Sequence, residues 1–169
     1  VQTLQDRGAS DVLFDMNSRY DVPGYGYQIA MGETALAESW QSRDYLSHNH
    51  CMLGHLYSWL FSGIGGISQE SGSTAYKRIV IDPQIVGDLR DARVSFRSPY
   101  GLIRSEWKDA PDEFVQTIEI PANATARICL PATDPAKVTE SGKPVSGRKD
   151  MAVESGTDGR IELHVGSGV

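Results

Sequence analysis

The residues best suited to chemistry lie in the stretch GETALAESWQSRDYLSHNH, which runs from Gly32 to His50. The spacing of its apolar residues predicts a helix over Glu33–Trp40. On that helix Glu33 and Glu38 would lie about 140° apart around the axis, so at most one of them can face a pocket. Trp40 would follow at the helix end, where a large ring can form the wall of a sugar site. The simpler interpretation is that both glutamates are solvated and that Trp40 belongs to the core.

A carboxylate in such a pocket suits the hydrolysis of a glycosidic bond. One carboxylic acid protonates the leaving oxygen while a second carboxylate activates water or attacks the sugar, and inverting enzymes hold the two about 6.5–9.5 Å apart. The sequence offers Glu38 as one candidate and shows no clear partner for it. The residues alone therefore predict one half of such a site.

Three histidines, His48, His50 and His55, suggest a zinc site as an alternative. His50 and His55 are five positions apart, however, rather than the four that place two ligands on one helix face, and no HExxH motif is present. The sequence has no GxSxG motif, and its glycine-rich SGIGGIS follows a predicted helix rather than a strand, which argues against a phosphate loop. We therefore expect no metal and no cofactor. His55 is predicted to be a packed or half-exposed helix residue, whereas His50 can donate a hydrogen bond to a ligand hydroxyl.

The composition is that of a globular protein with a sizeable core. The 169 residues are 40% hydrophobic and 22% charged, and the formal net charge of −6 argues against nucleic acid and anionic lipid as partners. The most apolar run, Cys51–Ile67, is too short and too interrupted for membrane insertion. Cys51 and Cys129 form no CxxC motif, so neither a zinc site nor a disulfide framework is predicted. The chain opens without Met or a signal-peptide pattern, and we expect an excised piece of a longer protein.

Up to about Ser73 the apolar residues recur at helical spacing. A short helix is predicted around Val12–Met16, and a long apolar helix is predicted from the capping residue Asn49 to Ile64. The glycines within Gly63–Gly66 are expected to end the long helix. Because this helix is apolar beyond one face, we expect it to be buried among more helices than the chain supplies.

From about Tyr76 the period of the pattern changes to two, which is typical of β-strands. The alternating segments are RIVID, ARVSFR, GLIRSEW, EFVQTIEI, TARICL and RIELHV, with turns at SPYG, Gly142 and Asp158–Gly159. Helices followed by short strands predict an α+β chain whose second part is an antiparallel sandwich. Trp107, Tyr100 and Phe114 alternate with polar residues as core positions do, so no aromatic row predicts a sugar-stacking surface.

Several ordered blocks of the sequence resemble a known family. They are PGYGYQIAMGETALAESW, SHNHCMLGHLYSWLFSGIGGI and YKRIVIDP, followed by SPYGLIRSEW and IPANATARICLP. In this order they are similar to the C-terminal part of the α-L-rhamnosidases of glycoside hydrolase family 78, over nearly the whole chain. The resemblance implies that residues 1–74 form the last helices of an (α/α)6 catalytic barrel and residues 75–169 a C-terminal antiparallel β-sandwich domain. The remainder of the parent barrel would then be a partner of this chain.

The same resemblance implies an inverting enzyme that releases terminal α-L-rhamnosyl residues, so a rhamnose-containing carbohydrate would be its substrate. The family segment GATTxWExW matches Gly32, Thr34, Glu38 and Trp40. This match makes Glu38 the general base that holds the attacking water. The Asn-His pair before the long apolar helix makes His50 a sugar ligand, and Asn49 and Trp40 would be wall or supporting residues of the substrate-binding site.

Two positions depart from the family segment, because Ala35 stands at its second Thr and Ala37 at its common Trp. The family's general acid lies in an upstream barrel segment that nothing in this chain matches, so we expect the chain alone to be inactive. Family analogy favours a periplasmic or secreted location. Two alternatives stay open at this point. One is a barrel glycosidase for another sugar, and the other is a non-catalytic β-sandwich that serves as a structural or carbohydrate-binding module.

Overall fold

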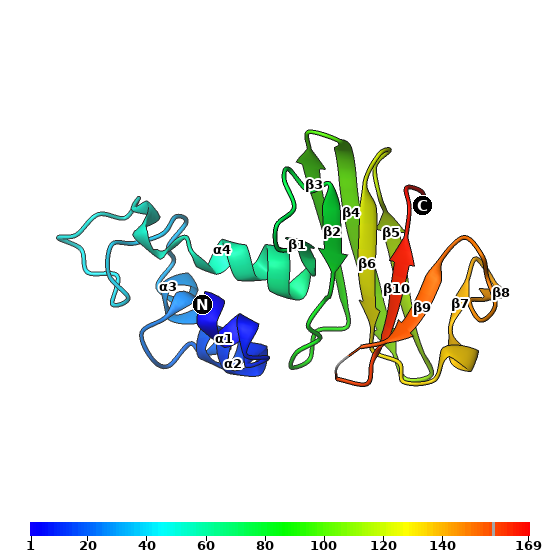
Figure 1. Ribbon diagram of the computed structural model, residues 1–169. Coiled ribbons are helices and arrows are strands. Elements are labelled where there is room, and N and C mark those ends of the chain that lie inside the picture. The colour runs from blue at the N-terminus through cyan, green and yellow to red at the C-terminus, as the bar shows by residue number, and fades with distance from the viewer. Residues whose placement is uncertain (157) are drawn as a thin grey trace.

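The structure is a computed structural model that describes residues 1–156 and 158–169. Helices occupy the first part of the chain and β-strands occupy the rest. In Figure 1 the helices lie on one side and the sheets on the other, and α4 runs toward the sheets. The prediction of an α+β chain is therefore confirmed.

The helical part consists of short helices and one long irregular segment. The bounds are α1 Gln2–Asp6, α2 Ser10–Ser18, α3 Tyr25–Ala30, the 3₁₀ turn η1 Cys51–Leu53, α4 Leu56–Trp59 and the π-helical turn η2 Leu60–Ile64. The helix predicted around Val12–Met16 is confirmed as α2, in which Leu13 is buried while Val12 and Met16 are exposed. Across the described residues, every helix falls short of the length and hydropathy of a bilayer-spanning segment.

The helix predicted over Glu33–Trp40 is wrong, since this segment forms turns and bends. The helix lies earlier, in α3, and Gly32 ends it with a φ of +84°. The N–H of Gly32 donates to the carbonyl of Ile29 at 3.0 Å, and the N–H of Glu33 donates to the carbonyl of Gln28 at 3.0 Å. This pair of bonds is the usual glycine-ended cap of a helix C-terminus. The helical spacing of apolar residues therefore continues beyond Gly32, but the left-handed backbone of Gly32 ends α3 at that point.

The long helix predicted from Asn49 to Ile64 is broken into η1, α4 and η2. In η2 the N–H of Gly65 donates to the carbonyl of Leu60 at 3.1 Å, which is the wider spacing of a π-turn. The predicted stop at the glycines is confirmed, because Gly66 has a φ of +73°. Gly65 is needed for close approach, since a Cβ there would lie 2.4 Å from a methyl carbon of Val94.

The strands form a five-stranded sheet in the order β1-β2-β6-β10-β9, a three-stranded sheet β3-β4-β5 and a small pair β7-β8. Their bounds are β1 Ile67–Gln69, β2 Arg78–Ile81, β3 Asp91–Ser98, β4 Gly101–Ala110, β5 Glu113–Glu119, β6 Thr125–Leu130, β7 Thr139–Glu140, β8 Lys143–Pro144, β9 Ala152–Ser155 and β10 Ile161–Val165, with a 3₁₀ turn η3 at Pro135–Lys137. Each alternating segment of the sequence is thus a strand.

The prediction of a wholly antiparallel sandwich needs one correction, because β2 and β6 pair in parallel. Arg78 lies opposite Thr125, and Ile81 lies opposite Ile128. Parallel neighbours cannot be joined by a tight turn and need a crossover connection. Here β3, β4 and β5 form that connection: the chain leaves β2, builds the second sheet, and returns to β6 beside β2.

The two larger sheets bury one face of each strand, as the alternating pattern predicts. In β3 the side chains of Ala92, Val94 and Phe96 turn inward, and their neighbours Arg93 and Arg97 are exposed. The core of the sandwich is aliphatic. Its buried members include Ile67, Ile79, Ile81, Ile103, Ile120, Ile128, Val145, Ile161 and Leu163.

A second core joins the helices to the end of the three-stranded sheet. Trp107 of β4 is 2% exposed and packs with Leu13 of α2, Trp59 of α4 and Ile64 of η2. Its indole N–H donates to the carbonyl of Ile64 at 2.8 Å. The predicted boundary at residues 74 and 75 falls between β1 and β2, which pair with each other. The division into domains 1–74 and 75–169 stays a prediction.

Candidate active-site loop

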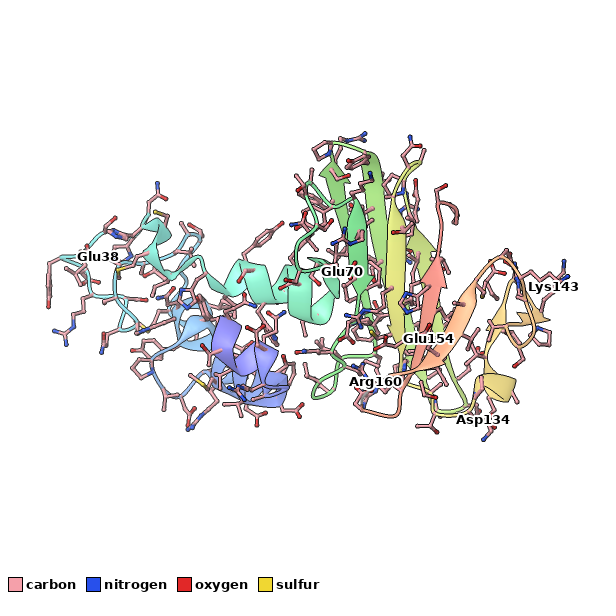
Figure 2. The ribbon with its side chains drawn as sticks, viewed as in Figure 1. Glu38, Glu70, Asp134, Lys143, Glu154 and Arg160 are labelled. Carbon is pink, nitrogen blue, oxygen red and sulfur yellow. The ribbon has the colours of Figure 1, made fainter. Side chains whose placement is uncertain are left out.

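All four predicted site residues lie on the irregular segment between α3 and η1. Figure 2 shows Glu38 at the end of the helical part that is farthest from the sheets. Glu38, Trp40 and His50 are half-buried, and Asn49 is exposed. The sequence therefore places the candidate residues together, but on a loop instead of the predicted helix.

Backbone hydrogen bonds join two limbs of this loop, which are residues 36–38 and residues 47–50. The N–H of Glu38 donates to the carbonyl of Ser47 at 2.8 Å, and the N–H of His50 donates to the carbonyl of Leu36 at 2.7 Å. The N–H of Ser47 in turn donates to Oε2 of Glu38 at 3.2 Å. The limb that carries Glu38 and the limb that carries His50 are thus neighbours, although twelve positions separate the two residues. A hydrogen bond from the main chain also restricts the orientation of the Glu38 carboxylate.

Trp40 is held by residues of α3 that sequence reasoning missed. The ring of Tyr25 meets the ring of Trp40 edge-on, with centroids 4.8 Å apart. Burial raises the pKa of the Tyr25 hydroxyl, which donates to the carbonyl of Leu53 in η1. The buried side chain of Gln28 donates to the carbonyl of Ser39 at 3.1 Å. Tyr25 and Gln28 are three positions apart on one helix face, and that spacing was the available sign of their shared role.

An ion pair closes the base of the loop. Nδ1 of His48 lies 2.7 Å from Oε1 and 2.9 Å from Oε2 of Glu33. The Glu33 hydrogen bond, with a smaller contribution from the nearby charge of Asp44, raises the pKa of His48 above its ordinary value. The sequence offered His48 only as a possible zinc ligand and Glu33 as a solvated residue. Sequence reasoning missed the pairing because Glu33 was placed on a helix, away from His48.

The role of Asn49 as a helix cap is wrong. The first helical turn after the loop begins at Cys51, so His50 occupies the capping position, and no side chain caps the turn. The backbone N–H of Asn49 instead donates locally to Oγ of Ser47 at 3.3 Å. Asn49 therefore shapes the limb that carries His50, and its exposed side chain contributes nothing to the start of η1.

The histidines are not arranged as a metal centre in the structure. Among residues 1–156 and 158–169, no three His, Cys, Asp or Glu side chains converge as ligands would. Nδ1 of His48 is engaged by Glu33, and His55 is exposed at the start of α4. His55 was predicted to be packed or half-exposed, and the structure excludes the packed alternative.

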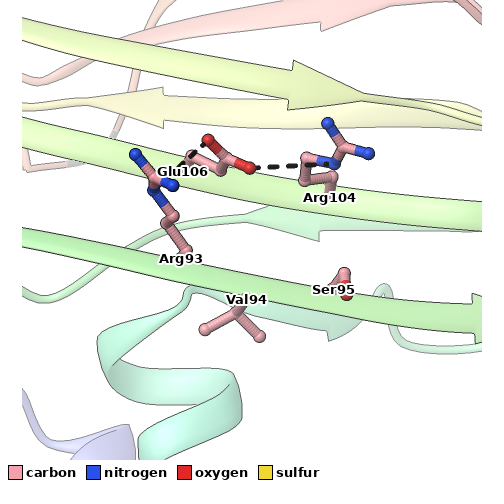
Figure 3. Close-up of a pocket in the computed structure, with 5 residues that line it drawn as sticks. All are labelled: Arg93, Val94, Ser95, Arg104 and Glu106. Carbon is pink, nitrogen blue, oxygen red and sulfur yellow. Dashed lines mark ion pairs between the residues drawn. The ribbon is translucent and has the colours of Figure 1, made fainter.

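The outer face of the three-stranded sheet carries a shallow hollow of about 340 Å³. Figure 3 shows its lining, in which Glu106 lies between Arg93 and Arg104. The ion pairs measure 3.7 Å to Arg93 and 3.8 Å to Arg104. Trp107 offers no ring to this surface, because it points to the opposite face and stacks with Phe114 in the core. This surface is a network of charges with no aromatic ring in its lining.

Comparisons with known proteins place this geometry in a family. Residues 1–64 match the bacterial α-L-rhamnosidase 6 hairpin glycosidase domain, and residues 66–144 match the bacterial α-L-rhamnosidase C-terminal domain. An α-L-rhamnosidase of Streptomyces avermitilis is 31% identical over 147 residues, which cover 82% of this chain and 14% of that protein. This chain therefore corresponds to a small part of such a relative.

Solved structures agree with the sequence matches. The crystal structure of the Streptomyces avermitilis α-L-rhamnosidase complexed with L-rhamnose superposes with a TM-score of 0.84 at 29% identity, covering 98% of this chain and 16% of that one. The α-L-rhamnosidase from Dictyoglumus thermophilum gives a TM-score of 0.82 at 26% identity, covering 99% and 19%. With the helices and the sheets both matched in sequence and in structure, the chain belongs to the α-L-rhamnosidase family, as a C-terminal portion of it.

Proposed function

We propose that this chain is part of an inverting α-L-rhamnosidase, a glycoside hydrolase, in which Glu38 is the general base. The observation that carries the proposal is the hydrogen bonding between the two loop limbs, which places Glu38 and His50 on neighbouring segments of the loop. A general base and a hydrogen-bonding ligand of the same sugar must both reach one bound substrate, and the pairing of the two limbs keeps Glu38 and His50 close enough for this. The family membership supplies the substrate class, which is a rhamnose-containing carbohydrate.

Each site residue has a proposed role that follows from its chemistry. Glu38 removes a proton from the water that attacks the anomeric carbon, and the Ser47 N–H fixes one of its oxygens. His50 donates a hydrogen bond to a hydroxyl of the sugar. Trp40, which Tyr25 holds edge-on, forms a wall against the apolar face of the ring. Asn49 is a weaker candidate for a contact to substrate. The acid that protonates the leaving oxygen comes from the remainder of the barrel, about 6.5–9.5 Å from Glu38.

The helical part has the surface expected of a piece of a larger (α/α)6 barrel. Large apolar side chains are exposed on it in unusual number for a free surface. Of the twelve exposed large hydrophobic residues among those described, nine lie before residue 61, namely Val12, Met16, Tyr20, Ile29, Met31, Tyr45, Met52, Tyr57 and Leu60. Further helices of the parent barrel would cover them. We keep residues 1–74 as the barrel portion and residues 75–169 as the sandwich domain.

The sandwich serves as a structural support and not as a carbohydrate-binding module in this proposal. Its ring of greatest size, Trp107, is buried against the helices. Its outer hollow is lined by paired charges. Sugar recognition usually needs an exposed aromatic ring beside polar groups, because the ring covers the apolar face of the sugar. Only Tyr100, at the β3–β4 turn, is an exposed aromatic residue among those described in the strands and their turns.

The test is Glu38→Gln in the full-length protein that contains this chain, assayed for release of rhamnose from a chromogenic α-L-rhamnoside. We expect a fall in kcat of about 100-fold or more, because the loss of a general base typically costs about 10²–10⁴. Glu154→Gln is the matched control, since Glu154 is exposed on β9 in the sheet part of the molecule, away from Glu38 (Figure 2). Wild-type turnover by Glu38→Gln would remove Glu38 from the mechanism.

The stereochemistry of the product tests the second part of the proposal. Proton NMR of the first-formed rhamnose should show the anomer opposite in configuration to the substrate, and retention would exclude the role of Glu38 as a base for direct attack. The 169-residue chain by itself should release no rhamnose, because the acid is supplied by the remainder of the barrel. Turnover by that chain would contradict this division of roles.

A further inference from the structure

The loop that carries Glu38 and His50 has little secondary structure of its own to hold it. Residues 31–50 include no helix and no named strand. Two backbone bonds join the limbs, between Glu38 and Ser47 and between His50 and Leu36. These bonds join the limbs to each other, but neither of them ties the His50 limb to α3. A contact of that kind would fix the position of His50 relative to α3 as well as to Glu38.

The Glu33–His48 ion pair is placed to provide that contact. Glu33 is anchored by its main chain, because its N–H donates to the carbonyl of Gln28 in α3 at 3.0 Å. Its carboxylate holds Nδ1 of His48 through both oxygens. His48 lies two residues before His50 and one after Ser47, which binds Glu38. The pair therefore fastens the His50 limb to the end of α3.

Because Glu33 is largely buried, its carboxylate depends on the positive charge of His48 for stabilisation. The side chain of Glu33 is 10% exposed, and that of His48 is 41% exposed. A carboxylate so far from water needs a cationic or donating partner, since an unpaired buried charge is costly. Protonated His48 supplies both a charge and an N–H. The other groups that face His48 are Asp44, which adds negative charge, and the backbone carbonyl of Arg43. Both favour the protonated imidazole.

We propose that Glu33 and His48 are a positioning pair for Glu38 and His50, so that catalytic efficiency falls when His48 loses its proton. This inference rests on the proposed function. The sign follows from linkage: a partner that binds the protonated imidazole raises the pKa of His48, so its contribution is complete at pH values below the ordinary pKa of histidine. The contribution is lost as the pH rises through the higher pKa of the folded protein. Neither side chain exchanges a proton with substrate.

The experiment compares kcat/KM of the full-length protein with that of His48→Gln at a series of pH values. The ratio of the two kcat/KM values removes the effect of every titrating group that the two enzymes have in common. We expect the wild type to be about fivefold more efficient at low pH, which is the scale of a half-exposed ion pair. The ratio should approach one above the pKa of His48. Glu33→Gln should give the same curve, and the double variant should be no worse than either single one.

His55→Gln is the matched control, because His55 is an exposed histidine in the same region and has no ion pair among the described residues. Its ratio to wild type should stay near one at every pH. A ratio for His48→Gln that is constant with pH, or a double variant whose losses simply add, overturns the positioning role. If His48→Gln fails to fold, Glu33→Gln decides the question by the same ratio. A wild-type enzyme without rhamnosidase activity would instead refute the proposed function.

Discussion

Trp107→Phe should weaken the junction between the helices and the three-stranded sheet by more than the loss of three ring atoms alone would suggest. The indole N–H of Trp107 donates to the carbonyl of Ile64 at 2.8 Å, and the side chain is 2% exposed. Phenylalanine keeps a ring at the site but removes the donor. The carbonyl of Ile64 ends the π-turn η2, so it would be left buried without this partner.

The expected loss has two contributions of similar size. A buried carbonyl that loses its hydrogen bond costs about 1–3 kcal/mol. The smaller ring leaves a cavity beside Trp59 and Leu13, which costs about 1 kcal/mol more if the site does not collapse. The sum is about 2–4 kcal/mol. Opening of this junction should then become about 30- to 900-fold more frequent, at about 1.36 kcal/mol for each factor of ten.

Hydrogen–deuterium exchange followed by mass spectrometry is the suitable assay, because it reads local opening in a protein of several parts. Peptides that cover η2 and the second half of β4, which contains Trp107, should exchange faster by the factor above in Trp107→Phe. Trp40→Phe is the matched control, since Trp40 is half-buried against Tyr25 and lies outside the cluster that contains Trp107. The reasoning is refuted if Trp107→Phe accelerates exchange in η2 by less than about fivefold, or no more than Trp40→Phe does.

Two further predictions concern positions where the structure leaves little freedom. Gly87→Ala should destabilise the protein by about 1–3 kcal/mol more than Gly142→Ala, because a Cβ at Gly87 would lie 2.1 Å from the ring of Phe14 whereas Gly142 has open space. Both glycines have a positive φ, so the backbone cost is shared. Equal losses in thermal unfolding would show that the ring of Phe14 moves aside without cost. A thiol reagent at pH 8 should modify Cys51, which is exposed, and spare Cys129 until the protein unfolds, because burial raises the pKa of Cys129 to about 11. Modification of both thiols at similar rates in the native protein would contradict the placement of Cys129.

The strands were predictable because their pattern is local. Alternation in the β3 segment, with Val94 and Phe96 against Arg93 and Arg97, depends only on neighbouring residues facing opposite sides of a sheet. The parallel pairing of β2 with β6 could not be predicted in this way. It depends on where the chain returns after β5, and that return is fixed by packing between residues about 47 positions apart, such as Arg78 and Thr125.

The helical part was harder to predict because tertiary contacts override helical spacing there. Glu33–Trp40 has apolar residues at suitable positions, but Gly32 caps α3 and the next residues are held by Gln28 and Ser47 instead. The identity of the site residues depended on the ordered sequence blocks and not on the secondary structure. The pairing of Glu33 with His48 required the fold of the loop, since a helix would have separated them.

The path between the loop and the sheets shows why a β-sandwich without a sugar surface can still matter to the site. Side-chain donors hold each turn of that path: Tyr25 donates to Leu53 in η1, and the indole of Trp59 in α4 donates to Oγ of Ser10 at 2.8 Å. Trp107 of the sheet holds Ile64 at the end of η2. Because η1 begins directly after His50, a displacement of η2 by the sheet would be carried along these anchored turns toward the His50 limb. These contacts are the route by which the sheet would support one side of the loop in the proposed function.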